Sequence, residues 1–413
     1  MMQSVKAKAF NILLIRFVKI GQSILTFFIM ASILGKEDFG YYAFNYAIAL
    51  SMIVLSYFGS EQYGLKALTK SKLFIGRLLV LKFLFSLVFS VLYLLISKLL
   101  TPDVRSFYVL LVVVHILFNF ELLIFNYLNS MNRLDLLARN ILISFFLSSI
   151  IKLYSLWLDD LDYLYIAIAL DAIIPFLLFC YVSFGFGHLS LNDKVLSKFS
   201  LFFKRHRKKL FFLFLATILV QINIRLDSYF VSVYLGGGQL SSYSIALKFN
   251  EVFAVLISST IALYSPRFFR AVNSHELSVI ARKIILITLI LYFFSMLIVF
   301  SLYGLINDYL LSGLYSEARN VIFVLFSGTL FGGFSSIISM WYIYNGRESS
   351  KTKRVFCSLL INIILSMLLI PPLGMIGAAI VSLIINFTLA IVLNLNAKAF
   401  REFSYEIICK KNS

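Results

Sequence analysis

Long apolar stretches alternate with short polar connections along almost the whole chain. About 20 consecutive apolar residues cross a bilayer as a helix, whereas a β-barrel strand needs about half that length. The pattern therefore predicts an all-α polytopic membrane protein with twelve transmembrane helices. The expected spans lie near residues 10–34, 39–58, 78–97, 106–128, 140–158, 163–184, 210–235, 241–265, 284–306, 321–344, 355–372 and 375–396.

The longest polar connection separates six predicted spans from the six that follow. We predict an N-terminal six-helix lobe at 1–187, a basic cytoplasmic linker at 188–209 and a C-terminal six-helix lobe at 210–413. The segment SILGKEDFGYYAF (32–44) aligns without gaps with VYLGGGQLSSYSI (233–245), although the similarity is weak. Two sets of six spans predict parallel repeats, which are typical of transporters with a substrate site between the halves.

The distribution of charge predicts the orientation of the chain. Its formal net charge is +18, yet 61% of its residues are hydrophobic and 14% are charged. Most of the 37 Lys and Arg residues lie at the termini or in even-numbered connections. The odd-numbered connections hold Lys36, Lys98, Arg105 and Arg319. The positive-inside rule then places both termini in the cytoplasm, so the basic excess needs no nucleic-acid partner.

Motifs for catalysis or metal binding are sparse. The three cysteines and four histidines are scattered, which gives no disulfide framework and no zinc spacing. The sequence contains no P-loop, GxSxG or HExxH motif, so we expect neither an enzyme nor a cofactor. Asp160-x-Asp162 has the form that metal-dependent glycosyltransferases use, but so short a pattern arises readily by chance. A membrane glycosyltransferase or repeat-unit polymerase is therefore the weakest alternative.

Three blocks of sequence resemble a known family. LGKEDFGYYAFNYAIAL (34–50), IRLDSYFVSVYLGGGQLSSYSIALKFNE (224–251) and NIILSMLLIPPLGMIGAAIVSLI (362–384) are similar to Wzx-type polysaccharide flippases of the MATE-like (MOP) exporter superfamily. The resemblance implies two six-helix lobes around a V-shaped cavity. It also implies translocation of undecaprenyl-diphosphate-linked oligosaccharide repeat units, for O-antigen or capsule, to the outer leaflet of the bacterial plasma (inner) membrane.

The resemblance further implies a set of partners and one serious rival. The expected partners are the lipid-linked oligosaccharide, membrane lipid, and the polysaccharide polymerase and chain-length machinery. A MATE-type cation-coupled drug exporter has the same architecture and stays open as an alternative. Organic cations favour acidic cavities, whereas the predicted spans of this chain contain more Lys and Arg than acids, which favours an anionic substrate.

Four intramembrane cations are candidates for binding the diphosphate or sugar, because guanidinium and ammonium groups pair with phosphate oxygens. They are Arg16, Lys19, Arg225 and Lys248. Arg16 and Lys19 share a helix face near the cytoplasmic end of the first span, although Arg16 could instead extend to lipid headgroups. Arg225 lies near the middle of its span, with a structural ion pair as the alternative. Lys248 and Glu251 are three residues apart and could simply pair with each other.

Four acids inside predicted spans are candidates for coupling transport to an H⁺ or Na⁺ gradient. They are Glu121, Asp171, Asp227 and Glu251. Asp171, near the middle of the sixth span, is the strongest of them, and a helix-packing role is the alternative.

Two further lysines and one glycine motif are expected to be structural. We expect Lys82 to extend to the membrane surface and Lys152 to pair with the acidic loop that holds Asp159, Asp160 and Asp162. The GxxxG spacing in GTLFGG (328–333) predicts close approach to a neighbouring helix.

Overall fold

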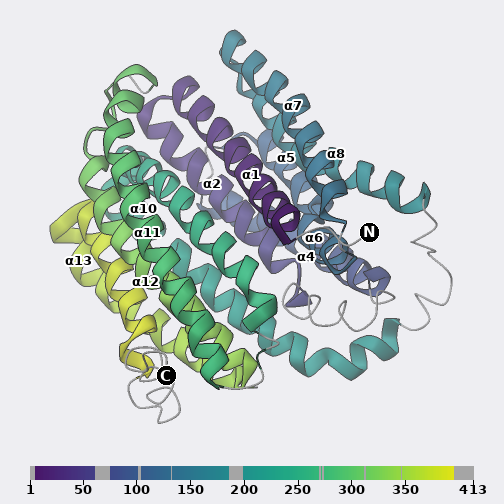
Figure 1. Ribbon diagram of the computed structural model, residues 1–413. Helices are drawn as coiled ribbons and strands as arrows, with labels where there is room; N and C mark the ends of the chain where they lie inside the picture. The colour runs from purple at the N-terminus through teal and green to yellow at the C-terminus, as the bar shows by residue number, and fades with distance from the viewer. Residues whose placement is uncertain are drawn as a thin grey trace. The chain divides into compact units, whose positions relative to one another are not determined.

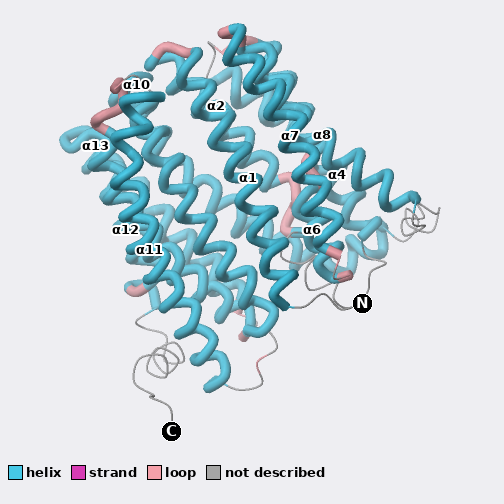
Figure 2. The backbone as a smooth tube through the Cα atoms, turned by 45° about the horizontal axis from the view of Figure 1, so that its top comes forward, coloured by secondary structure: helices cyan, strands magenta, loops and turns pink. Residues whose placement is uncertain are grey.

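The chain is all-helical. A computed structural model describes residues 5–60, 75–100, 104–131, 133–185, 199–268, 271, 274–310, 313–345 and 347–394. Within these ranges no strand occurs (Figure 2), which confirms the predicted fold class.

Ten helical segments in the described part of the chain are long and apolar enough to cross a membrane. Two of them, Leu210–Ser265 and Ser349–Asn394, are 56 and 46 residues long. A membrane-spanning helix needs about 20 residues. Since each of these two segments is broken near its middle, each supplies two consecutive spans. The ten segments therefore match the twelve spans predicted from the hydrophobic pattern.

The chain divides into two compact units, Met1–Gln221 and Ile222–Ser413. The helices of the first unit are α1 (Val5–Ile33), α2 (Lys36–Leu55), α4 (Ile75–Leu100), α5 (Ser106–Phe118), α6 (Glu121–Ser130), α7 (Leu134–Leu158) and α8 (Leu161–Gly185) (Figure 1). Their packing closes a ring in the order α1, α2, α4, α5, α8, α7. This ring places α1 beside α7 and α5 beside α8, which are distant along the sequence.

The start of helix α10 (Phe199–Phe268) completes the core of the first unit. Phe58 stacks on Phe85 with ring centroids 3.8 Å apart, and Leu210 belongs to the same buried cluster. Gly59 has a φ of +70°, and a Cβ there would lie 2.8 Å from the carbonyl oxygen of Leu210. Glycine is therefore required at this contact. Residues 186–198, including much of the predicted linker, lie outside the described residues.

The second unit contains the rest of α10 together with α11 (Ser274–Leu310), α12 (Ala318–Tyr344), α13 (Glu348–Ala390) and a short 3₁₀ helix, η2 (Val392–Asn394). Gly236 interrupts α10 with φ 78° and ψ −179°, and Gly374 interrupts α13 with φ 62° and ψ −143°. Residues with a Cβ rarely adopt these conformations. The glycines therefore mark the turns between spans seven and eight and between spans eleven and twelve.

Small residues bring α12 and α13 into close contact. A Cβ at Gly328 would lie 3.1 Å from the Cα of Leu383, and one at Gly332 would lie 3.2 Å from the Asn386 side-chain oxygen. This confirms the prediction from the GxxxG spacing, because the absence of side chains lets the two backbones approach.

We expect Gly377→Ala to destabilise the turn within α13. A Cβ at this position would overlap the carbonyl oxygen of Leu369, on the other side of the break at Gly374. Overpacking of this kind typically costs about 1–3 kcal/mol. The purified variant should therefore unfold at a lower temperature than the parent protein. Gly238→Ala is the matched control, because no atom lies within 4 Å of its Cβ position; equal effects of the two changes would contradict this explanation.

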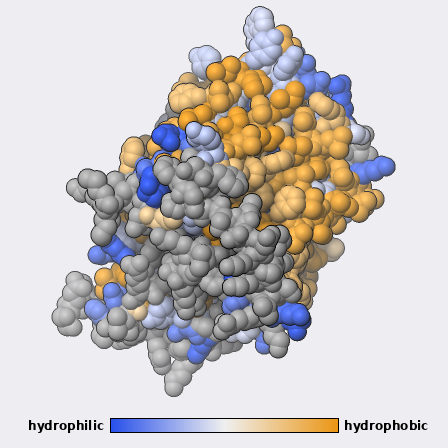
Figure 3. Space-filling model, turned by 90° about the vertical axis from the view of Figure 1, so that its right-hand side faces the viewer, coloured by the Kyte–Doolittle hydropathy of each residue, from blue (hydrophilic) through white to orange (hydrophobic). Residues whose placement is uncertain are grey.

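Large apolar side chains cover the exposed sides of α4 and α7. On α7, Phe146, Ile150 and Trp157 are 64%, 65% and 77% exposed, and Val91 and Leu99 are similarly exposed on α4. Figure 3 shows an extended hydrophobic surface on one side of the molecule. Soluble monomers rarely expose apolar patches of this extent, whereas lipid covers them at no cost. The packing thus agrees with a multi-pass membrane protein.

Candidate functional site

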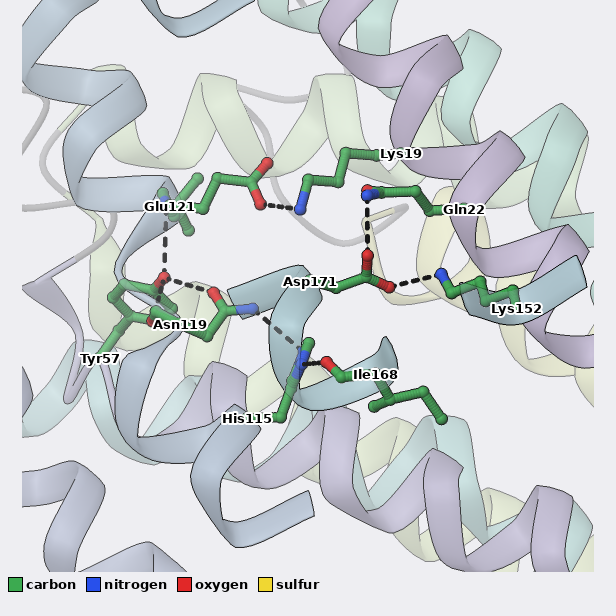
Figure 4. Close-up of polar contacts among 10 residues, drawn as sticks. Lys19, Gln22, Tyr57, His115, Asn119, Glu121, Lys152, Ile168 and Asp171 are labelled. Carbon is green, nitrogen blue, oxygen red and sulfur yellow. Dashed lines mark hydrogen bonds and ion pairs between the residues drawn. The ribbon is translucent and has the colours of Figure 1, made fainter. Parts of the chain in front are cut away.

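Polar side chains of α1, α5, α6, α7 and α8 form neighbouring groups of contacts in the first unit (Figure 4). Asp171 on α8 is the centre of one group. Its Oδ2 lies 2.6 Å from Nζ of Lys152 on α7, and its Oδ1 accepts a hydrogen bond of 3.0 Å from Nε2 of Gln22 on α1. The Lys152 side chain is fully buried and that of Asp171 is 10% exposed. Because α7 packs against both α1 and α8, the fold brings all three groups together.

The pairing of Lys152 differs from the sequence-based prediction. Lys152 does not pair with the acidic loop at 159–162, because its side chain points into the helix bundle towards Asp171. A buried ammonium requires a partner in the interior, and Asp171 supplies it. Both oxygens of Asp171 accept from protein donors. The Lys152 ammonium already compensates the charge of this carboxylate, although each oxygen keeps a second lone pair. The coupling role of Asp171 stays a prediction.

Lys19 and Glu121 form a second ion pair near the Asp171 group. Lys19 on α1 contacts Oε2 of Glu121, and the two side chains are 27% and 23% exposed. Lys19 lies three residues before Gln22, so one face of α1 carries both groups. Arg16 lies one turn earlier on this helix and is half-buried. Lys19 therefore has an internal carboxylate partner, and its role in binding substrate stays a prediction, as does that of Arg16.

The fourth span is broken in its middle, which the sequence analysis missed. Helix α5 ends at Phe118, Asn119 leaves the helical conformation with φ −78° and ψ 88°, and α6 begins at Glu121. The hydroxyl of Tyr57 lies at the break. It donates to the Asn119 carbonyl at 3.1 Å and accepts from the Leu122 amide at 3.2 Å. Tyr57 thus replaces helical hydrogen bonds that the break removes.

His115 also stabilises the broken helix, through contacts with Ile168 and Asn119. Its Nδ1 lies 2.7 Å from the Ile168 carbonyl, which can only accept, so Nδ1 carries the proton. Nε2 then accepts from Nδ2 of Asn119 at 3.4 Å. The polar residues Asn119 and Glu121 within an otherwise apolar span are the signal from which the break could have been predicted. In transporters, broken helices of this kind line ion or substrate sites.

Lys82 is the second cation that the sequence analysis misplaced. The prediction that it extends to the membrane surface is wrong, because its side chain is buried with 0% exposure. Its Nζ donates to Oγ of Ser56 at 2.5 Å and to the Ile116 carbonyl at 3.3 Å, beside the broken helix. The rings of Tyr57 and Phe120 lie 4.9 and 5.4 Å from the ammonium. A carbonyl released by the break and two aromatic rings therefore stabilise this charge.

We expect Tyr57→Phe to destabilise the first unit by about 1–3 kcal/mol, because it removes a hydrogen bond from the partly buried Leu122 amide and Asn119 carbonyl. Thermal unfolding of the purified protein measures the effect. Tyr181→Phe is the matched control, since Tyr181 is 80% exposed. If both variants unfolded at the temperature of the parent protein, the hydroxyl of Tyr57 would not stabilise the broken helix.

The second unit contains a cluster of two cations and one carboxylate on α10. Nζ of Lys248 lies 2.5 Å from Oε2 of Glu251, so the predicted pairing of these two residues forms. Arg225 interacts electrostatically with the same carboxylate. Arg225 is half-buried and Glu251 has a side chain that is 43% exposed. The three side chains together carry one excess positive charge, which is suited to an anion. The substrate-binding roles of Arg225 and Lys248 stay predictions.

Asp227 lies apart from that cluster, on the buried side of α10. It is 7% exposed, and its Oδ1 has no hydrogen-bond partner. One turn earlier, Oδ1 of Asn223 accepts a hydrogen bond of 2.7 Å from Nδ2 of Asn362 on α13. Ser366 donates to Oδ1 of Asn362 at 2.9 Å, so the chain of hydrogen bonds continues along α13. A buried carboxylate oxygen without a donor is unusual, because burial without a hydrogen bond is costly.

No cluster of three or more His, Cys, Asp or Glu suited to a metal ion occurs among the residues that the structure describes. The Asp160-x-Asp162 pattern has a local explanation. Oδ1 of Asp160 accepts a hydrogen bond of 2.8 Å from the backbone amide of Asp162, in the first turn of α8. Asp160 therefore caps an exposed helix end.

The fold is similar to those of solved membrane transporters. The chain matches a lipid II flippase, MurJ, with a TM-score of 0.68 and 19% identity over 96% of this chain and 90% of that one. It matches a multidrug resistance MATE family transporter of the MOP superfamily with a TM-score of 0.63 and 16% identity, over 98% and 100% of the two chains.

A MOP superfamily transporter from Pyrococcus furiosus, described as having a binding pocket of reversed polarity, matches with a TM-score of 0.67 and 10% identity, over 96% and 95% of the two chains. No protein-family model and no curated protein sequence matches the chain. The chain therefore has the all-helical fold that these MATE, MOP-superfamily and lipid II flippase proteins share.

Proposed function

We propose that this protein translocates undecaprenyl-diphosphate-linked oligosaccharide repeat units from the cytoplasmic to the outer leaflet of the plasma membrane by alternating access. The observation that carries the proposal is the cluster in the second unit, where Lys248 pairs with Glu251 and Arg225 adds a second cation that interacts electrostatically with the same carboxylate. A diphosphate crossing a region of low dielectric constant requires such an excess of positive charge. A guanidinium also offers the planar donor pair that phosphate oxygens accept.

Two further observations support a lipid-linked anionic substrate. The similarity to a lipid II flippase covers nearly the whole chain. The sequence blocks at 34–50, 224–251 and 362–384 resemble Wzx-type flippases. A MATE-type drug exporter is the rival, because multidrug transporters match the fold equally well. Under the proposal the chain acts in the bacterial inner membrane with both termini in the cytoplasm. It delivers repeat units to a polysaccharide polymerase and its chain-length machinery.

The lipid-linked saccharide pool of cells that lack this protein tests the proposal. We expect single repeat units to accumulate on the cytoplasmic leaflet and to disappear when the intact gene is returned. Loss of a polymerase would instead leave single units on the outer leaflet. A normal pool together with new sensitivity to cationic drugs would overturn the proposal in favour of the drug exporter.

Among the acids, Asp227 suits a coupling cation better than Asp171 does. Oδ1 of Asp227 is buried without a donor, whereas both oxygens of Asp171 accept from Lys152 and Gln22. We therefore expect Asp227→Asn to reduce the response of translocation to an imposed H⁺ or Na⁺ gradient by about tenfold, equivalent to about 1.4 kcal/mol of coupling. Translocation into vesicles with and without the gradient measures this. An unchanged gradient response in Asp227→Asn would show that Asp227 has a packing role.

A further inference from the structure

A cavity of about 320 Å³ opens at one end of the first unit. Three helix connections form it. They are the turn from α1 to α2 with Ile33, Leu34 and Asp38, the start of α5 with Arg105 and Tyr108, and the turn from α7 to α8 with Asp159, Asp160 and Leu161. Ligand pockets commonly have volumes of about 300–1,000 Å³. These connections follow spans one, three and five, which the distribution of Lys and Arg predicts on the outer side of the membrane.

Tyrosine rings form the floor of this cavity. Tyr42 and Tyr108 line it with little exposure, 8% and 2%, and their ring centroids are 5.9 Å apart with an interplanar angle of 61°. Behind them Tyr165 stacks on Tyr108 with a centroid distance of 4.3 Å and an angle of 9°. Tyr41 adds a half-exposed ring at the side. Packing from behind fixes the rings of Tyr42 and Tyr108, and Tyr41 presents the most exposed aromatic surface to a ligand.

The rim of the cavity carries both acceptors and donors of hydrogen bonds. Asp38 and Asp159 are exposed, and the bond from the Asp162 amide to Oδ1 of Asp160 fixes the orientation of the Asp160 carboxylate. Arg105 is anchored through Nη1, which lies 3.5 Å from the Tyr108 hydroxyl. The rim therefore presents three carboxylates and one guanidinium around tyrosine rings.

This combination suits an uncharged, hydroxyl-rich saccharide. Three carboxylates repel an anion, and Arg105 offsets one of their charges and adds a hydrogen-bond donor. Saccharide hydroxyls can donate to the carboxylates and accept from the guanidinium and tyrosine groups. The apolar faces of sugar rings pack on aromatic side chains, as apolar surfaces in pockets generally do.

We propose that this cavity binds the saccharide head of the transported molecule at the end of the first unit that faces the outer leaflet. The inference rests on the proposed function and adds to it a saccharide site in the first unit, separate from the cationic cluster on α10. The site uses Asp38, Asp159 and Asp160 as acceptors, Arg105 as a donor and Tyr41, Tyr42 and Tyr108 as the packing surface.

Binding of a free saccharide to the full-length protein in lipid nanodiscs tests the inference. The probe is the water-soluble oligosaccharide that mild acid releases from the lipid-linked pool of the same cells, which carries no lipid and no diphosphate. Titration by calorimetry, with saturation-transfer NMR for the bound protons, should show binding. We expect Asp38→Asn to weaken this binding about tenfold, equivalent to about 1.4 kcal/mol. Glu37→Gln changes the neighbouring exposed acid, which does not line the cavity, and should leave binding unchanged.

Tyr41→Ala is the second test variant, and both variants should elute and unfold like the parent protein because the changed residues are exposed or half-exposed. Equal binding in the parent, Asp38→Asn and Tyr41→Ala would overturn the site, as would no binding to the parent. Binding of tetraphenylphosphonium in place of the saccharide, lost in Asp38→Asn, would assign the cavity to organic cations.

Failure of the saccharide to bind while translocation persists refutes the cavity alone. A normal lipid-linked pool in cells without the protein refutes the proposed function itself.

Discussion

Lys152→Met is expected to destabilise the first unit by about 3–5 kcal/mol, the typical cost of removing one partner from a buried ion pair. The change leaves Asp171 with Gln22 as its remaining donor in a region where its carboxylate is 10% exposed. Asp171→Asn should have an effect of similar size, because it leaves the fully buried ammonium of Lys152 without its carboxylate. Unfolding of the purified protein in detergent or nanodiscs measures both.

The double variant Lys152→Met with Asp171→Asn tests whether the lost stability comes from leaving one charge of the pair without its partner. It removes both charges, and Gln22 can still donate to the new amide, so most of the lost stability should return. The matched control is Arg133→Met, since Arg133 and Asp135 form an exposed pair with 50% and 47% side-chain exposure. Exposed pairs contribute little, and this control should unfold like the parent. A double variant as unstable as Lys152→Met alone would show that the pair is not the source of the effect.

Arg225→Ala is expected to reduce translocation about 100-fold while leaving the protein in the membrane at its normal level. Two charge-assisted hydrogen bonds to phosphate contribute about 3 kcal/mol or more, and each 1.4 kcal/mol is a factor of ten. Arg225→Lys keeps the charge but loses the planar donor pair, so it should retain part of the activity. The rate at which lipid-linked repeat units reach the outer leaflet measures both variants.

Arg319→Ala controls for the loss of a cation in the same unit. Arg319 is exposed, and its guanidinium lies 4.4 Å from the ring centroid of Phe300. It is not one of the proposed substrate-binding residues. This variant should translocate at the normal rate. Normal surface polysaccharide in cells that carry Arg225→Ala would remove Arg225 from the substrate route and with it the main support for an anionic substrate.

The spans were predictable because each depends on local composition. Apolar runs of about 20 residues, the glycines at the turns and the small residues of 328–333 all act through neighbouring residues in the sequence. The turn at Gly374 and the close approach of α12 to α13 followed from these patterns. The pairing of Lys248 with Glu251 was also foreseeable, since the two lie on one face of one helix.

The partners of the buried lysines were not predictable, because they depend on which helices become neighbours. Lys152 meets Asp171 since α7 packs against α8, and Lys82 meets the Ile116 carbonyl since α4 packs against α5. The break after Phe118 releases that carbonyl, and hydropathy alone does not show a break inside an apolar span. Asn119 and Glu121, the polar residues beside the break, are the local sign of it.

Translocation by the purified protein in vesicles tests the central claim most directly. The vesicles contain lipid-diphosphate-linked repeat units that start in one leaflet, and a membrane-impermeant enzyme that oxidises exposed sugars reports the leaflet that holds them. We expect the parent protein to expose the saccharide at the opposite surface with time, and Arg225→Ala vesicles to match protein-free ones. Equal rates in vesicles with the parent protein and vesicles without protein, under imposed H⁺ or Na⁺ gradients of either direction, would contradict the account.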